Sequence, residues 1–188
     1  MRGFRRGYGS EVPGSLDAST IVTSRLSLRG LSIADADEMA TVLADPALHE
    51  FTGGQPATLD ELRDRYAKWV EGSRSADEVW LNWIVRRAAD DAAVGTVQAT
   101  IVDLDKAPTA FVAWIVGSSW QGNGYASEAA SALVQWLVTQ RIESVMAHVH
   151  PDHRASAAVA ARAGLQPTSV IVDGEVEWRL QAAPAEPS

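Results

Sequence analysis

The chain has 188 residues, of which 46% are apolar and 21% are charged, a composition typical of one globular domain with a full hydrophobic core. It contains no cysteine, which excludes disulfide bonds, thiolate metal ligands and a cysteine nucleophile, and which favours a cytoplasmic location. The formal net charge of −8 argues against nucleic acid as a partner and favours a cationic acceptor such as an amine, although acidic surfaces also simply keep proteins soluble.

Both ends of the chain are predicted to be flexible tails. Residues 1–20 are rich in glycine and lack a periodic apolar pattern, and residues 181–188 are rich in proline and alanine. Neither a secretory signal nor an apolar stretch long enough to cross a membrane is found, so no membrane partner is expected. We therefore expect a single domain at residues 21–180.

The first half of this domain is predicted to hold one strand and two helices. Residues 25–31 alternate like a half-buried strand, and residues 35–44 have the pattern of a short helix. A second helix is predicted to begin at Thr58, where Glu61 completes a capping box. The polar loop between the two helices, residues 49–56, could line a substrate entrance, although most such loops carry no function.

The second half of the domain is predicted to complete the sheet. Three successive strands indicate an antiparallel meander, and the pair Asp173-Gly174 predicts a hairpin near the end of the domain. The predicted elements are strands at 80–86, 93–102, 109–116, 144–150, 170–172 and 175–180 and helices at 124–140 and 155–163. This order predicts an α+β (mixed α/β) domain without internal repeats.

The most informative segment is a glycine-containing turn between the strand at 109–116 and the helix at 124–140. Gly122 and Gly124 let the backbone approach an anion closely, and the helix start supplies free N–H groups and a positive dipole end. On the glycines alone, a tight structural turn explains the segment equally well. A P-loop is excluded because no lysine follows, and Glu143 does not end a strand as the acid of a dinucleotide fingerprint would. Coenzyme A is a third kind of ligand that could use such a turn.

The residues around this turn resemble those of the GNAT acyltransferase superfamily, in particular its branch related to RimJ and RimL. The family motif is Arg or Gln, two residues, Gly, one residue, and Gly or Ala, and it is matched by Gln121, Gly122, Asn123, Gly124, Tyr125 and Ala126. Flanking matches in the same order are the strand at 25–29, Trp120, Glu128-Ala129, Pro151 with His153 and Ser156, and Gly164-Leu165. The resemblance spans residues 24–180.

The resemblance implies a GNAT-like, mostly antiparallel twisted sheet of about six or seven strands flanked by about four helices. It implies acetyl-CoA as co-substrate, no metal, and transfer of the acetyl group to a primary amine, either a protein N-terminus or a small molecule, by direct attack in a ternary complex. The matched motif residues 121–126 would hold the pyrophosphate, while Ile115, Val116, His153 and Ser156 would contact the pantetheine arm. Ser156 would also protonate the leaving thiolate.

Two positions depart from the family pattern, and the general base is open. His153 stands where the family has asparagine, and Ala160 stands where many members have a tyrosine acid. A catalytically degenerate domain that binds acyl-CoA as a sensor or assembly module is therefore an alternative. Glu50 is the candidate general base, with His49 and His150 as further candidates, and a chain of waters could serve instead.

A second alternative is a zinc hydrolase. The sequence from His148 through His150 to His153 has the spacing of a zinc motif, but no further histidine follows it to complete a site. The sequence also contains seven tryptophans, some of which could pair at a surface, so a homodimer is left open.

Overall fold

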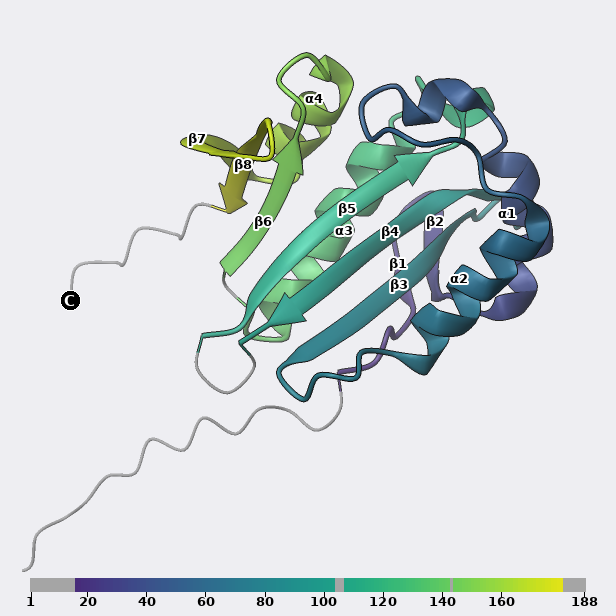
Figure 1. The fold of residues 1–188 in the computed structure, drawn as a ribbon, viewed down its shortest axis with the longest axis horizontal. Coiled ribbons are helices and arrows are strands. Elements are labelled where there is room, and N and C mark those ends of the chain that lie inside the picture. The colour runs from purple at the N-terminus through teal and green to yellow at the C-terminus, as the bar shows by residue number, and fades with distance from the viewer. Residues whose placement is uncertain (1–15, 104–106, 143, 181–188) are drawn as a thin grey trace, which may run out of the picture.

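One twisted sheet of eight strands organises the fold, as Figure 1 shows. The computed structural model describes residues 16–103, 107–142 and 144–180. The strand order is β1-β2-β3-β4-β5-β6-β8-β7, and every neighbouring pair is antiparallel except β5 and β6. The strands are β1 Ile21–Val22, β2 Leu26–Gly30, β3 Glu78–Arg87, β4 Ala93–Val102, β5 Thr109–Val116, β6 Ser144–Val149, β7 Leu165–Val172 and β8 Glu175–Leu180.

Four α-helices and three short 3-10 turns complete the described structure. The helices are α1 Ala36–Val42, α2 Leu59–Glu71, α3 Tyr125–Thr139 and α4 Arg154–Arg162, and the turns are η1 Ile33–Asp35, η2 Pro46–His49 and η3 Ser118–Trp120. The predicted mixed α+β fold with a mostly antiparallel sheet and four helices is confirmed. The sheet has one strand more than the expected six or seven, because β1 contains only two residues and is too short to show an alternating pattern.

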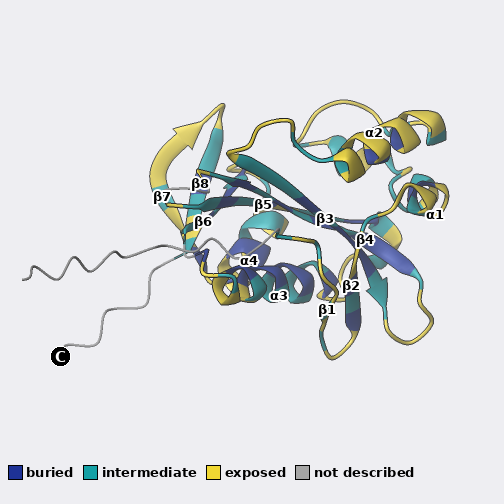
Figure 2. Cartoon of the chain, turned by 90° about the horizontal axis from the view of Figure 1, so that it is seen from below, coloured by how far each residue is buried: buried dark blue, intermediate teal, exposed yellow. Residues whose placement is uncertain are grey.

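The two faces of the sheet are covered by different helices, as Figure 2 shows edge-on. Trp83 and Ile84 are successive residues of β3, so their side chains point to opposite faces. Trp83 belongs to the larger core, which is formed with α3 through Leu133 and neighbouring side chains. Ile84 belongs to a smaller core with Met39 of α1 and Leu62 of α2. Helix α3 therefore covers one face, and α1 and α2 cover part of the other.

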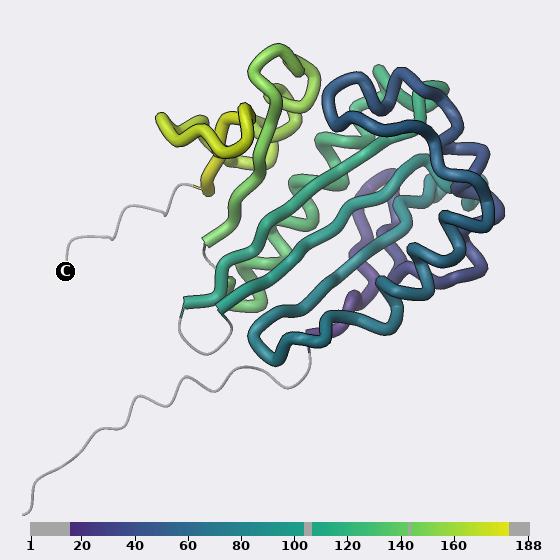
Figure 3. Tube along the Cα trace, viewed as in Figure 1, coloured from purple at the N-terminus to yellow at the C-terminus, as the bar shows by residue number. Residues whose placement is uncertain are grey.

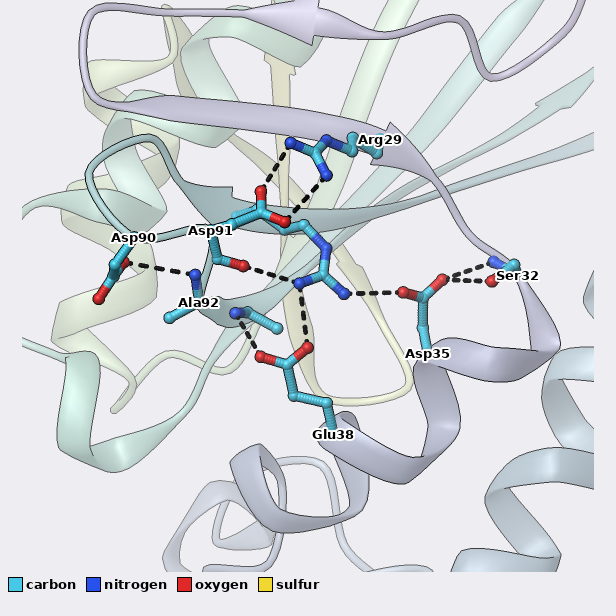
Figure 4. A network of polar contacts seen from close by, with 9 residues as sticks. Arg29, Ser32, Asp35, Glu38, Asp90, Asp91 and Ala92 are labelled. Atoms are coloured by element: carbon cyan, nitrogen blue, oxygen red, sulfur yellow. Dashed lines mark hydrogen bonds and ion pairs between the residues drawn. The ribbon is translucent and has the colours of Figure 1, made fainter.

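The start of α1 is joined to the β3–β4 hairpin by the polar network in Figure 4. The Arg86 guanidinium donates to the carboxylate of Asp35 at 2.9 Å and pairs with Glu38 at 3.0 Å. Glu38 also accepts a hydrogen bond from the backbone N–H of Ala93 at 2.8 Å. Burial tends to raise the pKa of Asp35, but hydrogen bonds from Ser32 and Arg86 outweigh it and lower the pKa.

The predicted tails lie mostly outside the described residues. Residues 1–15 and 181–188 are among those not described, so the tail boundaries stay predictions. Within the predicted N-terminal tail, Leu16 and Ala18 pack against the larger core, and the carbonyl of Ser19 accepts a hydrogen bond from Trp83 Nε1 at 2.8 Å. No helix in the described ranges is long and apolar enough to cross a bilayer.

Candidate functional site

The sheet opens between β5 and β6, the one parallel pair. The two strands pair only at Thr109 with Ser144, Ala110 with Val145, and Phe111 with Met146. Beyond Phe111 and Met146 the strands diverge, which Figures 1 and 3 show as a widening gap. The facing backbone edges there have no strand partner among the described residues, so they can pair with an extended ligand.

A cavity of about 1030 Å³ occupies this opening and its surroundings. This volume is at the upper end of the range of about 300–1,000 Å³ that is common for small-molecule sites. Its walls come from β4, β5, β6, the turn before α3, the first turns of α3, helix α4 and the loop before α2. The cavity therefore reaches both faces of the sheet through the gap between β5 and β6.

The turn before α3 forms the wall at the wide end of the gap. Gly122 and Gly124 adopt φ angles of 77° and 78°, a left-handed conformation in which a side chain would be strained. The first amides of α3 have no acceptor within the helix and meet the positive end of its dipole. The side chain of Gln121 donates to the Val116 carbonyl at 3.1 Å, and that of Asn123 donates to the carbonyl of Trp120 at 3.0 Å. These two side chains brace the turn and leave the backbone amides to bind an anion.

A clamp of partly exposed polar side chains holds this turn against the start of the sheet. Glu128 of α3 accepts hydrogen bonds from Thr23 Oγ1 at 2.5 Å and from the Arg25 backbone N–H at 3.0 Å. The Arg25 guanidinium pairs with the same carboxylate at 2.6 Å and donates to the Asn123 carbonyl at 3.0 Å. Burial opposes ionisation of Glu128, but the hydrogen bonds from Thr23 and Arg25 outweigh it and lower its pKa. Glu128 thus anchors the start of α3 to the segment before β2.

The remaining predicted cofactor-binding residues also line the cavity. Tyr125 is 9% exposed, and the Arg25 guanidinium lies over its ring at 5.2 Å from the centroid. Ile115 lines the cavity on the face of α1 and α2, whereas Val116, next along the strand, points to the face of α3. Ala126 lines it from the first turn of α3.

Helix α4 brings His153 and Ser156 to the cavity wall. His153 is the N-cap of this helix, and its Nδ1 accepts a hydrogen bond from the Ser156 backbone N–H at 3.4 Å. The proton of the neutral ring therefore lies on Nε2, which makes that atom a donor. Burial lowers the pKa of His153 and nearby His150 adds to this effect, while the Glu50 carboxylate opposes it. The ring also stacks on Phe51, with centroids 4.3 Å apart.

The structure does not bring the candidate base Glu50 into the cavity wall. Glu50 is exposed at the end of η2, and neither it nor His49 lines the cavity, whereas His150 does. The neighbouring Phe51 turns inward instead and also lies 5.3 Å from the His150 ring. Phe51 and Arg25 are cavity residues that sequence reasoning did not assign to any site, and His148, which it considered only as a zinc ligand, also lines the cavity. Phe51 could have been suspected because it is the one aromatic residue of its loop.

The zinc alternative finds no support in the geometry. Within the described part of the chain, no three histidine, aspartate or glutamate side chains are grouped so that they could hold a metal ion. His150 Nδ1 accepts the Asp152 backbone N–H at 3.2 Å and His153 Nδ1 accepts that of Ser156, so both rings carry their proton on Nε2. His148, His150 and His153 therefore do not form the predicted ligand set.

Comparison with known proteins identifies relatives along most of the chain. Residues 25–166 match the acetyltransferase (GNAT) domain family. An uncharacterized N-acetyltransferase p20 of Bacillus licheniformis is 25% identical over 158 residues, which cover 83% of this chain and 87% of that protein.

Two solved structures resemble the fold closely. The acetyltransferase from Agrobacterium tumefaciens is 26% identical with a TM-score of 0.65, and the similarity covers 89% of this chain and 97% of that one. The ribosomal L7/L12 alpha-N-protein acetyltransferase RimL in complex with coenzyme A is 18% identical with a TM-score of 0.70, covering 85% and 96%.

Proposed function

The chain belongs to the GNAT acetyltransferase family and is an N-acetyltransferase, and we propose that it takes the acetyl group from acetyl-CoA and transfers it to a primary amine in a ternary complex. The observation that carries this proposal is the cavity itself. It joins an anion-binding helix start to an open strand edge, which suits a ligand with a pyrophosphate at one end and an extended amide-containing arm at the other. RimL, a structural relative, is known in complex with coenzyme A.

The chain's own residues fit the parts of such a ligand. Backbone amides at residues 122–126 would bind the pyrophosphate, and the unpaired edge at Ile115 and Val116 would pair with the pantetheine arm. Acetyl-CoA, when bound, supplies a thioester whose carbonyl carbon is open to attack. The Ser156 hydroxyl would give a proton to the departing sulfur, and His153 Nε2–H would donate to the arm.

The acceptor is proposed to enter from the face of α1 and α2. Helix α3 and the larger core pack on the opposite face, so the amine would reach the gap from the side lined by Thr96, Gln98 and His148. Glu175 contributes a carboxylate to the cavity wall, which favours a cationic acceptor. A peptide N-terminus and a small-molecule amine both satisfy this chemistry.

Calorimetric titration with acetyl-CoA tests the proposal. We expect the wild type to bind and the Gly124→Glu variant to lose binding, because the carboxylate would occupy the anion site. Gly72→Glu is the matched control, since Gly72 also has a positive φ of 85° with open space around it but lies at the end of α2. No binding by a folded wild type would refute the proposal, and binding without acetylation of any tested amine would favour the sensor alternative.

Location and assembly follow as further proposals. The absence of cysteine suits the cytoplasm, where thiol redox chemistry does not support disulfides. Homodimer formation stays a prediction that sedimentation equilibrium would test.

A further inference from the structure

We propose that His148 is the general base that removes the proton from the attacking amine. This inference rests on the proposed acetyl transfer. His148 belongs to β6 and lies two residues beyond Met146, the last residue that pairs with β5. If the parallel register continued, His148 would face Ala113, but the strands have separated at that point. The imidazole therefore stands at the narrow end of the gap.

The side chain lies on the face from which the acceptor would enter. His148 and Met146 are two residues apart on β6, so their side chains point to the same face of the sheet. Met146 pairs with Phe111, and the ring centroids of Phe111 and His148 are 5.8 Å apart. Following the register across β4 places Phe111 on the same face as Gln98 and Thr96, the face covered by α1 and α2. The phosphate-binding turn lies at the opposite, wide end of the gap. An arm that starts at that turn and follows β5 brings its reactive end towards His148.

His148 is also the cavity histidine with a lone pair available. The Nδ1 atoms of His150 and His153 each accept a backbone amide, so both rings present a protonated Nε2 to the cavity. In the described part of the chain, no hydrogen bond reaches either ring nitrogen of His148, and its one ring contact is with Phe111. In either tautomer, a neutral His148 ring therefore has one unprotonated nitrogen that can accept a proton.

The charged groups around His148 come mainly from β8. Glu177 is its direct cross-strand partner and is 7% exposed, with its carboxylate engaged by Arg179 at 3.1 Å and by Thr168 at 3.3 Å. Glu175, two residues earlier on the same face, lines the cavity. His150 follows on the chain, and β5 contributes Phe111 and Ala113, which do not titrate.

The proton and electron balance of the step is complete. The amine nitrogen forms a bond to the acetyl carbonyl carbon and gives one proton to His148, and the carbon–sulfur bond breaks with its electron pair remaining on sulfur. Ser156 protonates that sulfur and recovers its proton from solvent, while His148 releases one to solvent. The products are an N-acetyl amide and the free thiol of coenzyme A.

Nuclear magnetic resonance of the histidine rings tests the placement without any acceptor. The chain has four histidines, and the signal of His148 is assigned by its loss in His148→Gln. We expect acetyl-CoA to shift this signal and 3′,5′-ADP, which carries only the phosphate end, to leave it unchanged. Acetyl-CoA that binds by calorimetry without moving the signal would overturn the inference. Acetyl-CoA that does not bind at all would refute the proposed function instead.

Kinetics with tripeptide amides that begin with Ser, Ala or Gly test the chemistry. We expect His148→Gln to lower kcat about 10²–10⁴-fold with little change in the KM for acetyl-CoA. Added imidazole should partly restore His148→Ala, which a structural role would not allow. His49→Gln, outside the cavity, is the matched control. A kcat within twofold of the wild type in His148→Gln would contradict the assignment.

Discussion

Replacing Glu128 by glutamine tests whether the clamp beneath the glycine turn at residues 121–126 holds both the fold and the candidate site. The Glu128 side chain is 16% exposed, and its two oxygens accept from Thr23 and from the backbone and guanidinium of Arg25. Glutamine keeps the shape but has one acceptor oxygen. Its NH₂ group must face either the Arg25 guanidinium or the donors on the other side, so about half of the hydrogen bonds are lost.

We expect Glu128→Gln to lower the free energy of unfolding by about 2 kcal/mol. A hydrogen bond to a charged group contributes roughly 1.5–3 kcal/mol, and the ion pair contributes at most about 1 kcal/mol because the Arg25 side chain is 51% exposed. For a chain of this length, about 2 kcal/mol corresponds to a fall in Tm of about 4–8 °C. The loosened Arg25 also releases the Asn123 carbonyl, so we expect acetyl-CoA affinity to fall about tenfold.

Urea unfolding as a function of pH measures this effect. The folded-state pKa of Glu128 is lowered, so its stabilisation is present above the ordinary value of 4.5 and is lost as pH falls through the folded-state pKa. The difference in the free energy of unfolding between wild type and Glu128→Gln should therefore be largest at pH 7 and become smaller at acidic pH. Glu71→Gln, at the exposed end of α2, is the control. Equal unfolding free energies for Glu128→Gln and this control at pH 7 would refute the reasoning.

Three further predictions concern the frame around the site. Arg86→Ala should lower the free energy of unfolding, measured with urea, by about 2–3 kcal/mol, because the Asp35 carboxylate would lose its partner. The side chains of Asp35 and Arg86 are only 16% and 15% exposed. A decrease of less than about 1 kcal/mol would show that the network in Figure 4 contributes little to stability. The Tyr66 hydroxyl is buried with no hydrogen-bond partner among the described residues, and burial, together with the charge of Asp35, raises its pKa to about 12. The unfolded chain therefore releases this proton from about pH 10 while the folded chain retains it, so stability should fall between about pH 10 and 12, and Tyr66→Phe should remove that fall without lowering stability at pH 7. A Cβ on Gly95 would lie 2.1 Å from the Ile115 carbonyl oxygen, so Gly95→Ala should lower the free energy of unfolding by more than about 2 kcal/mol. Gly122 has open space around it and only an unfavourable φ, so Gly122→Ala should lower it by about 1 kcal/mol. Similar shifts in Tm for the two variants would contradict this contrast.

Much of the fold could be predicted because its signals are local. The capping box of α2 is present as predicted, with the Thr58 hydroxyl accepting from the Glu61 backbone N–H at 3.3 Å and the Glu61 carboxylate accepting from the Thr58 N–H at 2.8 Å. The hairpin at Asp173-Gly174 is also confirmed, and both residues have the positive φ angles that such a turn requires. These features depend on residues within four positions of one another.

The last strand pair shows where local reasoning ends. The sequence predicts a strand at 170–172, but β7 begins at Leu165 and is paired with β8 over most of its length. Its pairing is interrupted by a bulge between Pro167 and Ile171, which breaks the alternation that periodicity detects. Proline is tolerated there because β7 is the edge of the sheet.

The candidate site likewise has one part that is local in sequence and one part that only the fold assembles. The turn at residues 121–126 is contiguous, so the motif predicts its place in the structure. Arg25 reaches that turn from about 100 residues away, and Phe51 reaches His153 from the loop before α2, so only the folded topology brings them together. Glu50, chosen from the sequence as the base, precedes Phe51 by one residue, and only the latter points into the cavity.

The two departures from the family pattern are accommodated by the surrounding structure. Asparagine is a favoured N-cap because its side-chain oxygen accepts an amide of the first helical turn, and His153 Nδ1 makes the same contact with Ser156 while keeping a donor at Nε2. Ala160 is fully buried in the main core, where a tyrosine would require the surrounding side chains to move. A proton donor is therefore needed elsewhere, and Ser156, one turn before Ala160 on α4, lines the cavity. Loss of the tyrosine is thus compatible with turnover, provided that the Ser156 hydroxyl supplies the proton that the thiolate needs.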